Sequence, residues 1–421
     1  MAEELGRGVD AFAERWLGSG RLPCLACAVS VDGQTVYKRH HGWQDKEKGV
    51  PLREAVTGVA ALQLHEQGLW RLDDELAKFL PSFGRLPGVA RAEGEIEPLS
   101  RPILMRDVVT HTAGLLPLFS MPVLADGRQN FLMGRFNKQL FKGVMSGKVS
   151  SLEDFVELLA TFPLVHQPGT AWEYGWCIDI LGRVVEVISG KKFEAYCEEH
   201  IFGPLGMSST RFLQGVTPDL RSRMVQMYTA NTAELMKDPK KFLRGECEGP
   251  LMTPMGEKER ATFVPESFPI MPGGGLVSTV DDFMAFAQCL CDGGVGGPNR
   301  KRILAQRSVA MLGHDLLPRE CAYGPQVSLI NGKRRENASA TMSVGVACVK
   351  DPENAPMAPG AFEWGGLPST IFWVDPVHRL AVVCFTQLGP FPIYPLRSEL
   401  KDVVYKHVGS LPPPQPPRSR L

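Results

Sequence analysis

Residues 51–68 read PLREAVTGVAALQLHEQG, and this stretch decides how the chain must fold. From residue 55 to residue 64 nearly every position is apolar or small, the exceptions being Thr57 and Gln63. A helix that is apolar on almost all sides is buried inside a protein and does not lie on its surface. Gly68 follows as a typical C-terminal stop. The segment therefore predicts a central helix that the rest of the chain encloses.

The composition is that of a globular chain with enough apolar residues for a sizeable core. Of the 421 residues, 44% are hydrophobic and 22% are charged. Lys+Arg and Asp+Glu both number 46, so the net charge favours neither nucleic acid nor an anionic membrane as a partner. The first 18 residues lack the apolar run of a signal peptide, and no apolar run approaches the length of a membrane span. We therefore expect a cytoplasmic protein without a transmembrane segment.

Ten cysteines are scattered along the chain, which is unlike a dense disulfide framework and indicates reduced thiols. Cys24 and Cys27 have the spacing of a metal or redox pair, but residues three apart on a strand face opposite ways. His40 and His41 are also interpreted as a strand end, because no third ligand accompanies them. We expect no metal site and no cofactor.

The order of the predicted elements indicates the fold class. A hairpin with an Asp-Gly turn is expected within residues 24–38, helices in the middle of the chain, and strands and a final helix after residue 340. This order predicts an α+β fold of the α/β sandwich type: an antiparallel sheet flanked by helices and built from both chain ends, with a mostly helical middle subdomain. The strands are expected at residues 342–349, 361–364, 370–374 and 380–386, and the last helix at 399–407.

We expect a single domain over residues 1–411, with a sheet part at about 1–54 and 270–411 and a helical part at about 55–269. A Pro-rich tail follows at 412–421. Within the helical part, residues 72–81 are expected to form a short helix. Residues 118–150 are expected to form a substrate-facing excursion.

Tyr174 is the first candidate site residue. It lies in the sequence Trp172-Glu173-Tyr174-Gly175-Trp176, which follows a Pro-Gly turn at the mouth of a predicted helix. A tyrosine placed there can act as a general base if a neighbouring cation lowers its pKa. The alternative is that Tyr174 is a packed aromatic residue.

Two further segments are candidates for ligand binding. Trp364, Gly365 and Gly366 stand between strand-like stretches, and paired glycines there let a ligand approach backbone N–H groups that can hold an oxyanion. A plain Gly-Gly turn is the alternative. The third segment is His111-Thr112-Ala113-Gly114-Leu115, for which the alternative is an ordinary helix C-cap.

Taken in this order, the features resemble the serine β-lactamase-like superfamily, and most closely its esterase branch, whose relatives include the penicillin-binding proteins. The resemblance extends from Leu22 to about His407. By this resemblance, Tyr174 corresponds to the tyrosine of the family's second motif, with Gly175 and Trp176 as its neighbours. Trp364-Gly365-Gly366 stands where lactamases have Lys-Thr-Gly and esterases often have Trp-Gly-Gly. The segments that carry this resemblance include RDVVTHTAGL, QPGTAWEYGWCIDILGRVVEVISG, GGGLVSTVDDF and EWGGLPSTIFWVDP.

The resemblance implies a carboxylesterase that acts on small esters through an acyl-enzyme, but one motif is missing. The family places Ser-x-x-Lys at the N-terminus of its central buried helix, where the serine attacks the acyl carbon and the lysine helps to remove its proton. In this chain residues 51–54 run straight into residues 55–58, and roughly ten residues that would carry the motif are absent. No nucleophile is therefore present.

Two other Ser-x-x-Lys strings occur, and both are interpreted as helix ends. Ser189 and Lys192 flank the end of a predicted helix. Ser398 and Lys401 begin the last helix, where Ser398 is expected to be the N-cap.

Three interpretations of the gap remain open. The chain is a splice or gene-model product that lacks one short segment of an ordinary serine esterase, or a pseudoenzyme that binds an acyl or peptide-like ligand without turnover, or a poorly folded chain. The expected partner is a small-molecule ester or acyl ligand. Without its serine, the chain should form no acyl-enzyme.

Overall fold

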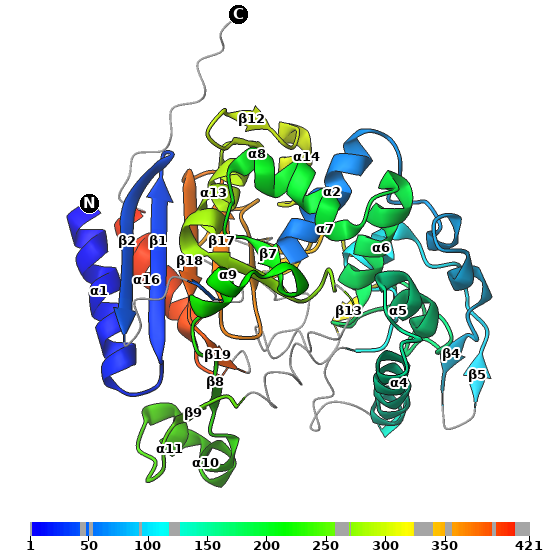
Figure 1. The fold of residues 1–421 in the computed structure, drawn as a ribbon, viewed down its shortest axis with the longest axis horizontal. Coiled ribbons are helices and arrows are strands. Elements are labelled where there is room, and N and C mark those ends of the chain that lie inside the picture. Colours follow the sequence, from blue (N-terminus) through cyan, green and yellow to red (C-terminus); the bar gives the residue numbers. More distant parts are fainter. Residues whose placement is uncertain are drawn as a thin grey trace, which may run out of the picture.

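Strands from both ends of the chain meet in one sheet. The computed structural model describes residues 2–42, 48–49, 54–91, 95–117, 127–256, 269, 271–323, 340–349, 356–389 and 393–408. Seven strands pair in the order β14-β15-β16-β17-β18-β1-β2, and every pairing is antiparallel (Figure 1). The α+β fold with a sheet from both chain ends is thus confirmed. The strands are β1 (Cys24–Val31), β2 (Gln34–Gly42), β14 (Ala340–Met342), β15 (Ala347–Val349), β16 (Phe362–Gly365), β17 (Ile371–Asp375) and β18 (Leu380–Phe385).

The predicted N-terminal hairpin is present and pairs with the C-terminal part of the chain. Asp32 and Gly33 both have positive φ angles, 53° and 77°, as the tight turn between β1 and β2 requires. Cys27 of β1 lies opposite Cys384 of β18. All ten cysteines are free thiols, and Cys27 is a buried packing residue.

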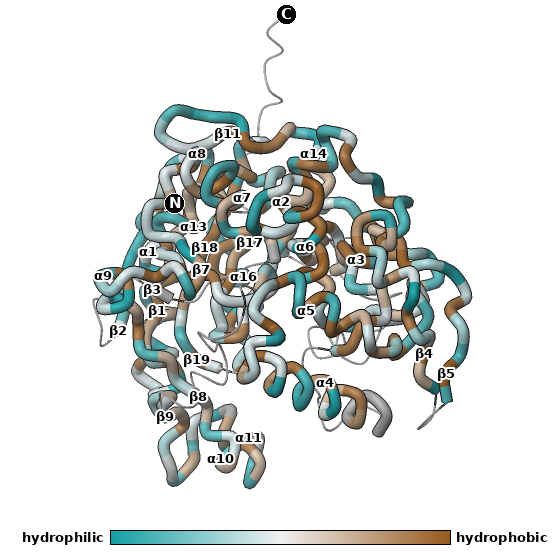
Figure 2. The backbone as a smooth tube through the Cα atoms, turned by 45° about the vertical axis from the view of Figure 1, so that its right-hand side comes forward, coloured by the Kyte–Doolittle hydropathy of each residue, from teal (hydrophilic) through white to brown (hydrophobic). Residues whose placement is uncertain are grey.

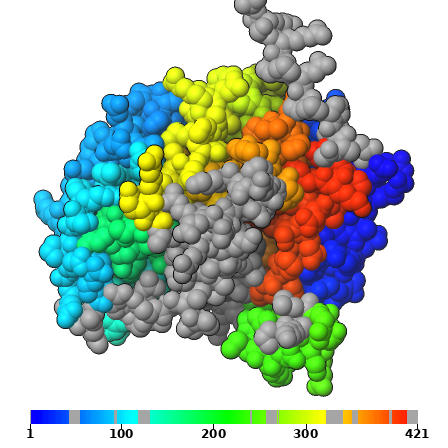
Figure 3. Space-filling view, turned by 180° about the vertical axis from the view of Figure 1, so that it is seen from behind, coloured from blue at the N-terminus to red at the C-terminus, as the bar shows by residue number. Residues whose placement is uncertain are grey.

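Helices cover both faces of the sheet. On one face, α1 (Ala2–Gly18) and α16 (Leu396–Val408) pack against the side of β1 that carries Cys27 and Val29. On the other face, α13 (Val280–Cys291) packs against β17 and β18 through Phe283. Seen from behind, the N-terminal and C-terminal elements lie side by side (Figure 3). Successive strand residues point to opposite faces, so the sheet separates two apolar layers.

The predicted central helix is α2 (Glu54–Glu66), and residues 55–64 are all buried. The hydroxyl of Thr57 donates to the carbonyl of Pro272 at 3.0 Å. Gly58 faces the backbone of Val344 so closely that a Cβ there would lie 2.5 Å from its carbonyl oxygen. The stretch 55–64 is therefore enclosed, as its apolar sequence predicts. The helix packs against α6 (Cys177–Ser189), α7 (Phe193–Cys197) and α14 (Gln306–Met311). Beyond it, α3 (Met105–Val109) and α5 (Leu152–Leu159) pack against α6, and α4 (Gly127–Met145) packs against α5.

Three local predictions were wrong. Residues 72–81 do not form a regular helix but two short turns, η1 (Leu76–Lys78) and η2 (Pro81–Arg85). The backbone N–H of Leu76 donates to Ile103, so this segment pairs with the approach to α3. Residues 342–349 form two strands, because Gly345 turns the chain with a φ of 67°. Residues 118–150 were predicted to be a substrate-facing excursion and not a core element, but residues 127–145 form α4, whose Phe136 and Leu140 are buried in the core; 118–126 lie outside the described residues.

The predicted tail at 412–421 also lies outside the described residues. Within the part of the chain that the structure describes, no helix is both long and apolar enough to cross a bilayer. The remaining elements are β3 (Lys48–Gly49), β4 (Val89–Ala90), β5 (Ile96–Glu97), β6 (Ala171–Trp172), η3 (Glu198–Phe202), α8 (Gly203–Leu205), β7 (Arg211–Phe212), η4 (Leu213–Gly215), α9 (Pro218–Ser222), β8 (Tyr228–Ala230), α10 (Thr232–Lys237), α11 (Pro239–Arg244), β9 (Met252–Pro254), β10 (Leu276–Thr279), β11 (Val295–Gly296), β12 (Lys301–Arg302), β13 (Ala322–Tyr323) and β19 (Leu388–Gly389).

Candidate active site

The three segments singled out in the sequence converge on one place. The ring centroid of His111 lies 5.1 Å from that of Tyr174, and the centroid of Tyr174 lies 5.9 Å from that of Trp364. The rings of His111 and Trp364 are nearly parallel at 6.5 Å. The ring of Trp172 stacks on that of Tyr174 at 6.2 Å and lies 6.0 Å from that of His111. These residues come from positions far apart in the sequence, and the fold assembles them into one aromatic cluster.

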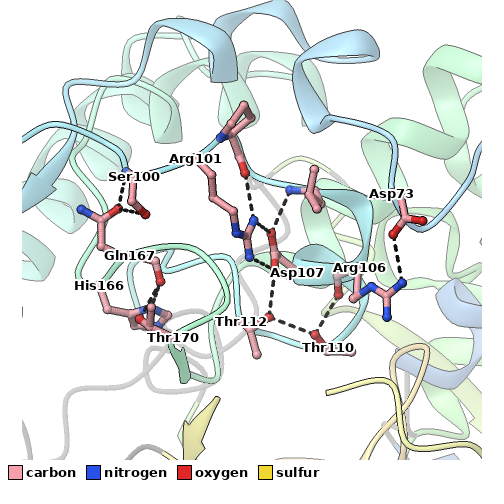
Figure 4. Close-up of polar contacts among 12 residues, drawn as sticks. Asp73, Ser100, Arg101, Arg106, Asp107, Thr110, Thr112, His166, Gln167 and Thr170 are labelled. Carbon is pink, nitrogen blue, oxygen red and sulfur yellow. Dashed lines mark hydrogen bonds and ion pairs between the residues drawn. The ribbon is translucent and has the colours of Figure 1, made fainter. Parts of the chain in front are cut away.

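A buried acid holds the loop that presents His111. Asp107 accepts two hydrogen bonds from the Arg101 guanidinium, at 2.6 and 2.9 Å, and one from the N–H of Leu104 at 2.8 Å (Figure 4). The N–H of Thr112 donates to the Asp107 carbonyl at 2.8 Å. The chain therefore turns sharply after α3, and His111 has a φ of 58°, which is uncommon for a residue with a side chain. The segment does end a helix, and it also directs His111 into the aromatic cluster.

His111 is fully buried, and neither of its ring nitrogens has a hydrogen-bond partner among the described residues. Burial lowers the pKa of its imidazole to about 3, so the ring is neutral at pH 7. His111 therefore supplies no positive charge that could lower the pKa of Tyr174. A neutral imidazole instead offers one N–H donor and one acceptor.

The second motif runs directly against this loop. The N–H of Glu173 donates to the His111 carbonyl at 2.9 Å, and Gly175 bridges to Pro117. A Cβ on Gly175 would lie 2.3 Å from the carbonyl oxygen of Leu116, so only glycine fits here. Trp176 points the other way and packs edge-on against Phe155 at 5.0 Å. Tyr174 is half-buried between these fixed points.

The third motif forms the turn from β16 to β17. The N–H of Gly366 donates to the carbonyl of Thr370 at 2.9 Å, so this amide is already used within the turn. The next amide, the N–H of Leu367, has no acceptor in the described part of the chain. Leu367 was not predicted from the sequence, because an amide that lacks a partner is visible only in the folded backbone. It is the candidate donor to an oxyanion at this turn.

Gly365, in the same turn, leaves room for a side chain of the last helix. A Cβ there would lie 1.8 Å from Nη2 of Arg397. Arg397 and Lys401 of α16 both face the carboxylate of Glu363, at 3.6 and 2.7 Å. Burial alone would raise the pKa of the Glu363 carboxyl, but Lys401 and Arg397 outweigh it and keep that pKa low. Burial also lowers the pKa of Lys401.

This charged cluster excludes Lys401 from the aromatic site. Glu363 and Trp364 are adjacent on β16 and therefore face opposite sides of the sheet. Lys401 binds Glu363, so it lies on the side opposite Trp364. The prediction that Ser398 is an N-cap was wrong: α16 begins at Leu396, and the Ser398 hydroxyl donates to the carbonyl of Pro395 at 3.0 Å. Ser189 does end α6, as predicted.

No serine occurs near the start of α2. The sequence has none between Ser30 and Ser82. The first hydroxyl of the helix, on Thr57, is buried and donates to Pro272. Residues 50–53, which precede α2, lie outside the described residues. No group of three or more His, Cys, Asp or Glu residues able to hold a metal ion occurs within the described ranges.

The chain belongs to the beta-lactamase family, whose sequence profile matches residues 9–402. It is 28% identical over 376 residues to an uncharacterized protein of Mycobacterium tuberculosis, with 83% of this chain and 82% of that protein covered. It is 25% identical over 424 residues to the esterase EstB of Burkholderia gladioli, with 96% of each chain covered.

Solved structures agree with this fold. The structure of EstCE1, described as a hydrolase with promiscuous acyltransferase activity, superposes with a TM-score of 0.72 at 19% identity and covers 96% of this chain and 99% of its own. The fold is thus that of esterase and acyltransferase members of the superfamily.

Proposed function

We propose that this chain carries the ligand-binding part of a small-ester carboxylesterase site and lacks the nucleophile needed for an acyl-enzyme. The observation that supports this best is the convergence of His111, Tyr174 and Trp364, together with the lack of any serine between Ser30 and Ser82, the stretch that contains α2. An esterase and a hydrolase among the similar proteins support the ester class of ligand. The chain as it stands is therefore impaired in covalent catalysis.

Each retained group has a defined task in this proposal. The acyl carbonyl oxygen would accept the N–H of Leu367, and the aromatic rings of Trp364 and Tyr174 would hold the acyl chain. Neutral His111 would donate to or accept from a polar atom of the ligand, because both of its nitrogens lack partners among the described residues. In a complete site, a serine at the start of α2 would attack the acyl carbon, and Tyr174 is the candidate base that would take its proton.

Restoring the missing segment tests this function. We expect that a family-type segment of roughly ten residues with Ser-x-x-Lys, inserted between Glu54 and Ala55, gives hydrolysis of p-nitrophenyl butyrate. The matched control carries the same segment with Ala in place of Ser and should remain inactive. A restored protein that is folded but inert on every ester and β-lactam tested would contradict the esterase proposal.

The second candidate function is a pseudoenzyme that binds an acyl or peptide-like ligand. The enclosed packing of α2 supports it, because Thr57 and Gly58 keep close contacts to Pro272 and Val344 without the missing segment. It requires that the unmodified chain binds such a ligand and that Tyr174→Ala and Trp364→Ala each weaken the binding. The transcript sequence across codons 50–60 distinguishes a splice product from a genuine loss.

Two further predictions from the sequence remain proposals. We place the whole chain up to residue 411 in one domain, with a sheet part at about 1–54 and 270–411 and a helical part at about 55–269. The cytoplasmic location is likewise proposed, on the absence of an apolar run of membrane-spanning length in the sequence.

A further inference from the structure

The outer face of α4 combines large apolar side chains with cations. Phe131, Phe141 and Met145 are exposed by 46%, 62% and 69%, and all three belong to this one helix. The helix lies at the lower edge of the molecule in both views (Figures 1 and 2). Because isolated apolar side chains are common on surfaces but clusters are not, a group of three on one helix indicates an interaction surface.

The same face is strongly basic. Positions 131, 135, 138, 142 and 145 are spaced by three or four residues, so Arg135, Lys138 and Lys142 share a face with Phe131 and Met145. Residues 127–152 contain five Lys or Arg and no Asp or Glu. Among the described residues, Arg135, Lys138 and Lys142 have no ion-pair partner. The equal totals of acids and bases in the whole chain therefore conceal a local basic surface.

Among the described residues, the acids of the neighbouring helix α5 do not neutralise this surface. Glu157 of α5 accepts a hydrogen bond from the hydroxyl of Ser82. On α5, which packs against α4, Glu153 is paired with Arg183 at 2.8 Å. Asp154 accepts the N–H groups of Ser150 and Ser151 at the start of that helix. All three carboxylates are thus engaged elsewhere.

The inner face of α4 fixes the helix beside the candidate site. Phe136 packs against Phe155 and Phe162 at 6.0 and 5.3 Å, and against Trp176 at 5.9 Å. Trp176 stands two residues after Tyr174. The basic and apolar face is therefore held rigidly on the outside of the layer that carries the second motif.

We propose that this outer face of α4, defined by Phe131, Arg135, Lys138, Phe141, Lys142 and Met145, docks on the surface of an anionic phospholipid bilayer. Phosphate and carboxylate headgroups would accept the three cations, while the phenyl and thioether groups would enter the interface. Exposed aromatic and apolar tips between lysines fit a fluid, anionic and partly apolar surface. A purely acidic polypeptide would match the cations and leave the apolar side chains without a partner.

Vesicle sedimentation of the full, unmodified chain tests this proposal. The expected result is binding to vesicles of equimolar phosphatidylcholine and phosphatidylserine, weakened by salt, with little binding to pure phosphatidylcholine. Each cation near an anionic surface contributes about fivefold to partitioning, so Lys138→Gln/Lys142→Gln should reduce it about 25-fold. The control Lys301→Gln/Lys406→Gln removes two exposed lysines on other elements and should leave the binding unchanged.

A second pair of variants separates the apolar contribution. Met145→Ser should weaken vesicle binding at least about fivefold. Met236→Ser, at a methionine that is 82% exposed on α10, should have no effect. All four variants alter exposed residues, and unchanged thermal unfolding would confirm that they fold.

Equal loss of binding in the α4 and control variants would overturn the proposal, as would tighter binding to soluble polyglutamate than to the anionic vesicles. Vesicle binding needs no catalysis, so its outcome is independent of the esterase proposal.

Discussion

Replacing His111 by Asn should change how stability depends on pH. Burial lowers the pKa of the His111 imidazole to about 3, whereas an unhindered histidine titrates near 6.5. Asn also tolerates the positive φ at this position, so the variant removes the titration without removing the turn. The comparison therefore isolates a single buried ring.

The sign and size follow from proton binding. Between about pH 6.5 and about pH 3 the unfolded chain binds a proton at this residue and the folded chain does not, so stability falls as the pH falls. Above about pH 6.5, the free energy of unfolding does not depend on the titration of His111. Below about pH 6.5, this titration lowers the free energy of unfolding by at most about 1.4 kcal/mol per pH unit. Between about pH 7.5 and about pH 4.5, His111 alone should lower the free energy of unfolding of the natural chain by about 2.7 kcal/mol.

Urea unfolding at several pH values measures this effect. Between about pH 7.5 and about pH 4.5, the free energy of unfolding of the natural chain should fall by about 2.7 kcal/mol more than that of His111→Asn. The control is His314→Asn, at an exposed histidine, whose difference should stay within about 0.5 kcal/mol. A flat difference for His111→Asn would refute the burial of a neutral imidazole in the cluster.

Two further predictions concern stability. Lys401→Met should lower the free energy of unfolding by about 3–5 kcal/mol in chemical denaturation, because it leaves the Glu363 carboxylate buried without its nearest cation. The double variant Glu363→Gln/Lys401→Met should recover much of this stability. Equal losses in the single and double variants would show that the ion pair is not the cause. Gly175→Ala should cost about 1–3 kcal/mol in the same assay, because its Cβ would meet the Leu116 backbone, whereas Gly134→Ala on α4 meets nothing and should be neutral or stabilising by up to about 1 kcal/mol.

Much of the fold could be predicted because its signals are local. The apolar run of α2 and the Asp32-Gly33 turn both identify their elements without reference to the rest of the chain. The failures occur where distant partners decide. Leu76 pairs its backbone with Ile103, and this tertiary contact overrides a helical sequence pattern.

The candidate site was predicted in its parts but not in its arrangement. Sequence motifs singled out Tyr174, Trp364 and the His111 segment, but no motif states that their rings meet. The N–H of Leu367, which has no acceptor among the described residues, is also invisible in the sequence, because its state depends on how Gly366 and Thr370 close the turn. Likewise, Lys401 lies in a formal Ser-x-x-Lys string, and only the fold shows that it binds Glu363 on the opposite face of the sheet.

The pairing of β1 with β18 has a consequence for synthesis on the ribosome. Roughly 350 residues separate the two strands, and at about 5–20 residues per second their translation takes about 20 to 70 seconds. During this time the β1–β2 hairpin has emerged, but one edge of β1 still lacks its partner, and an unpaired edge invites pairing with other nascent chains. A chaperone that shields this edge should therefore matter more than one that acts after release. A nascent chain that terminates before residue 380 would never complete the sheet, however intact its helices were.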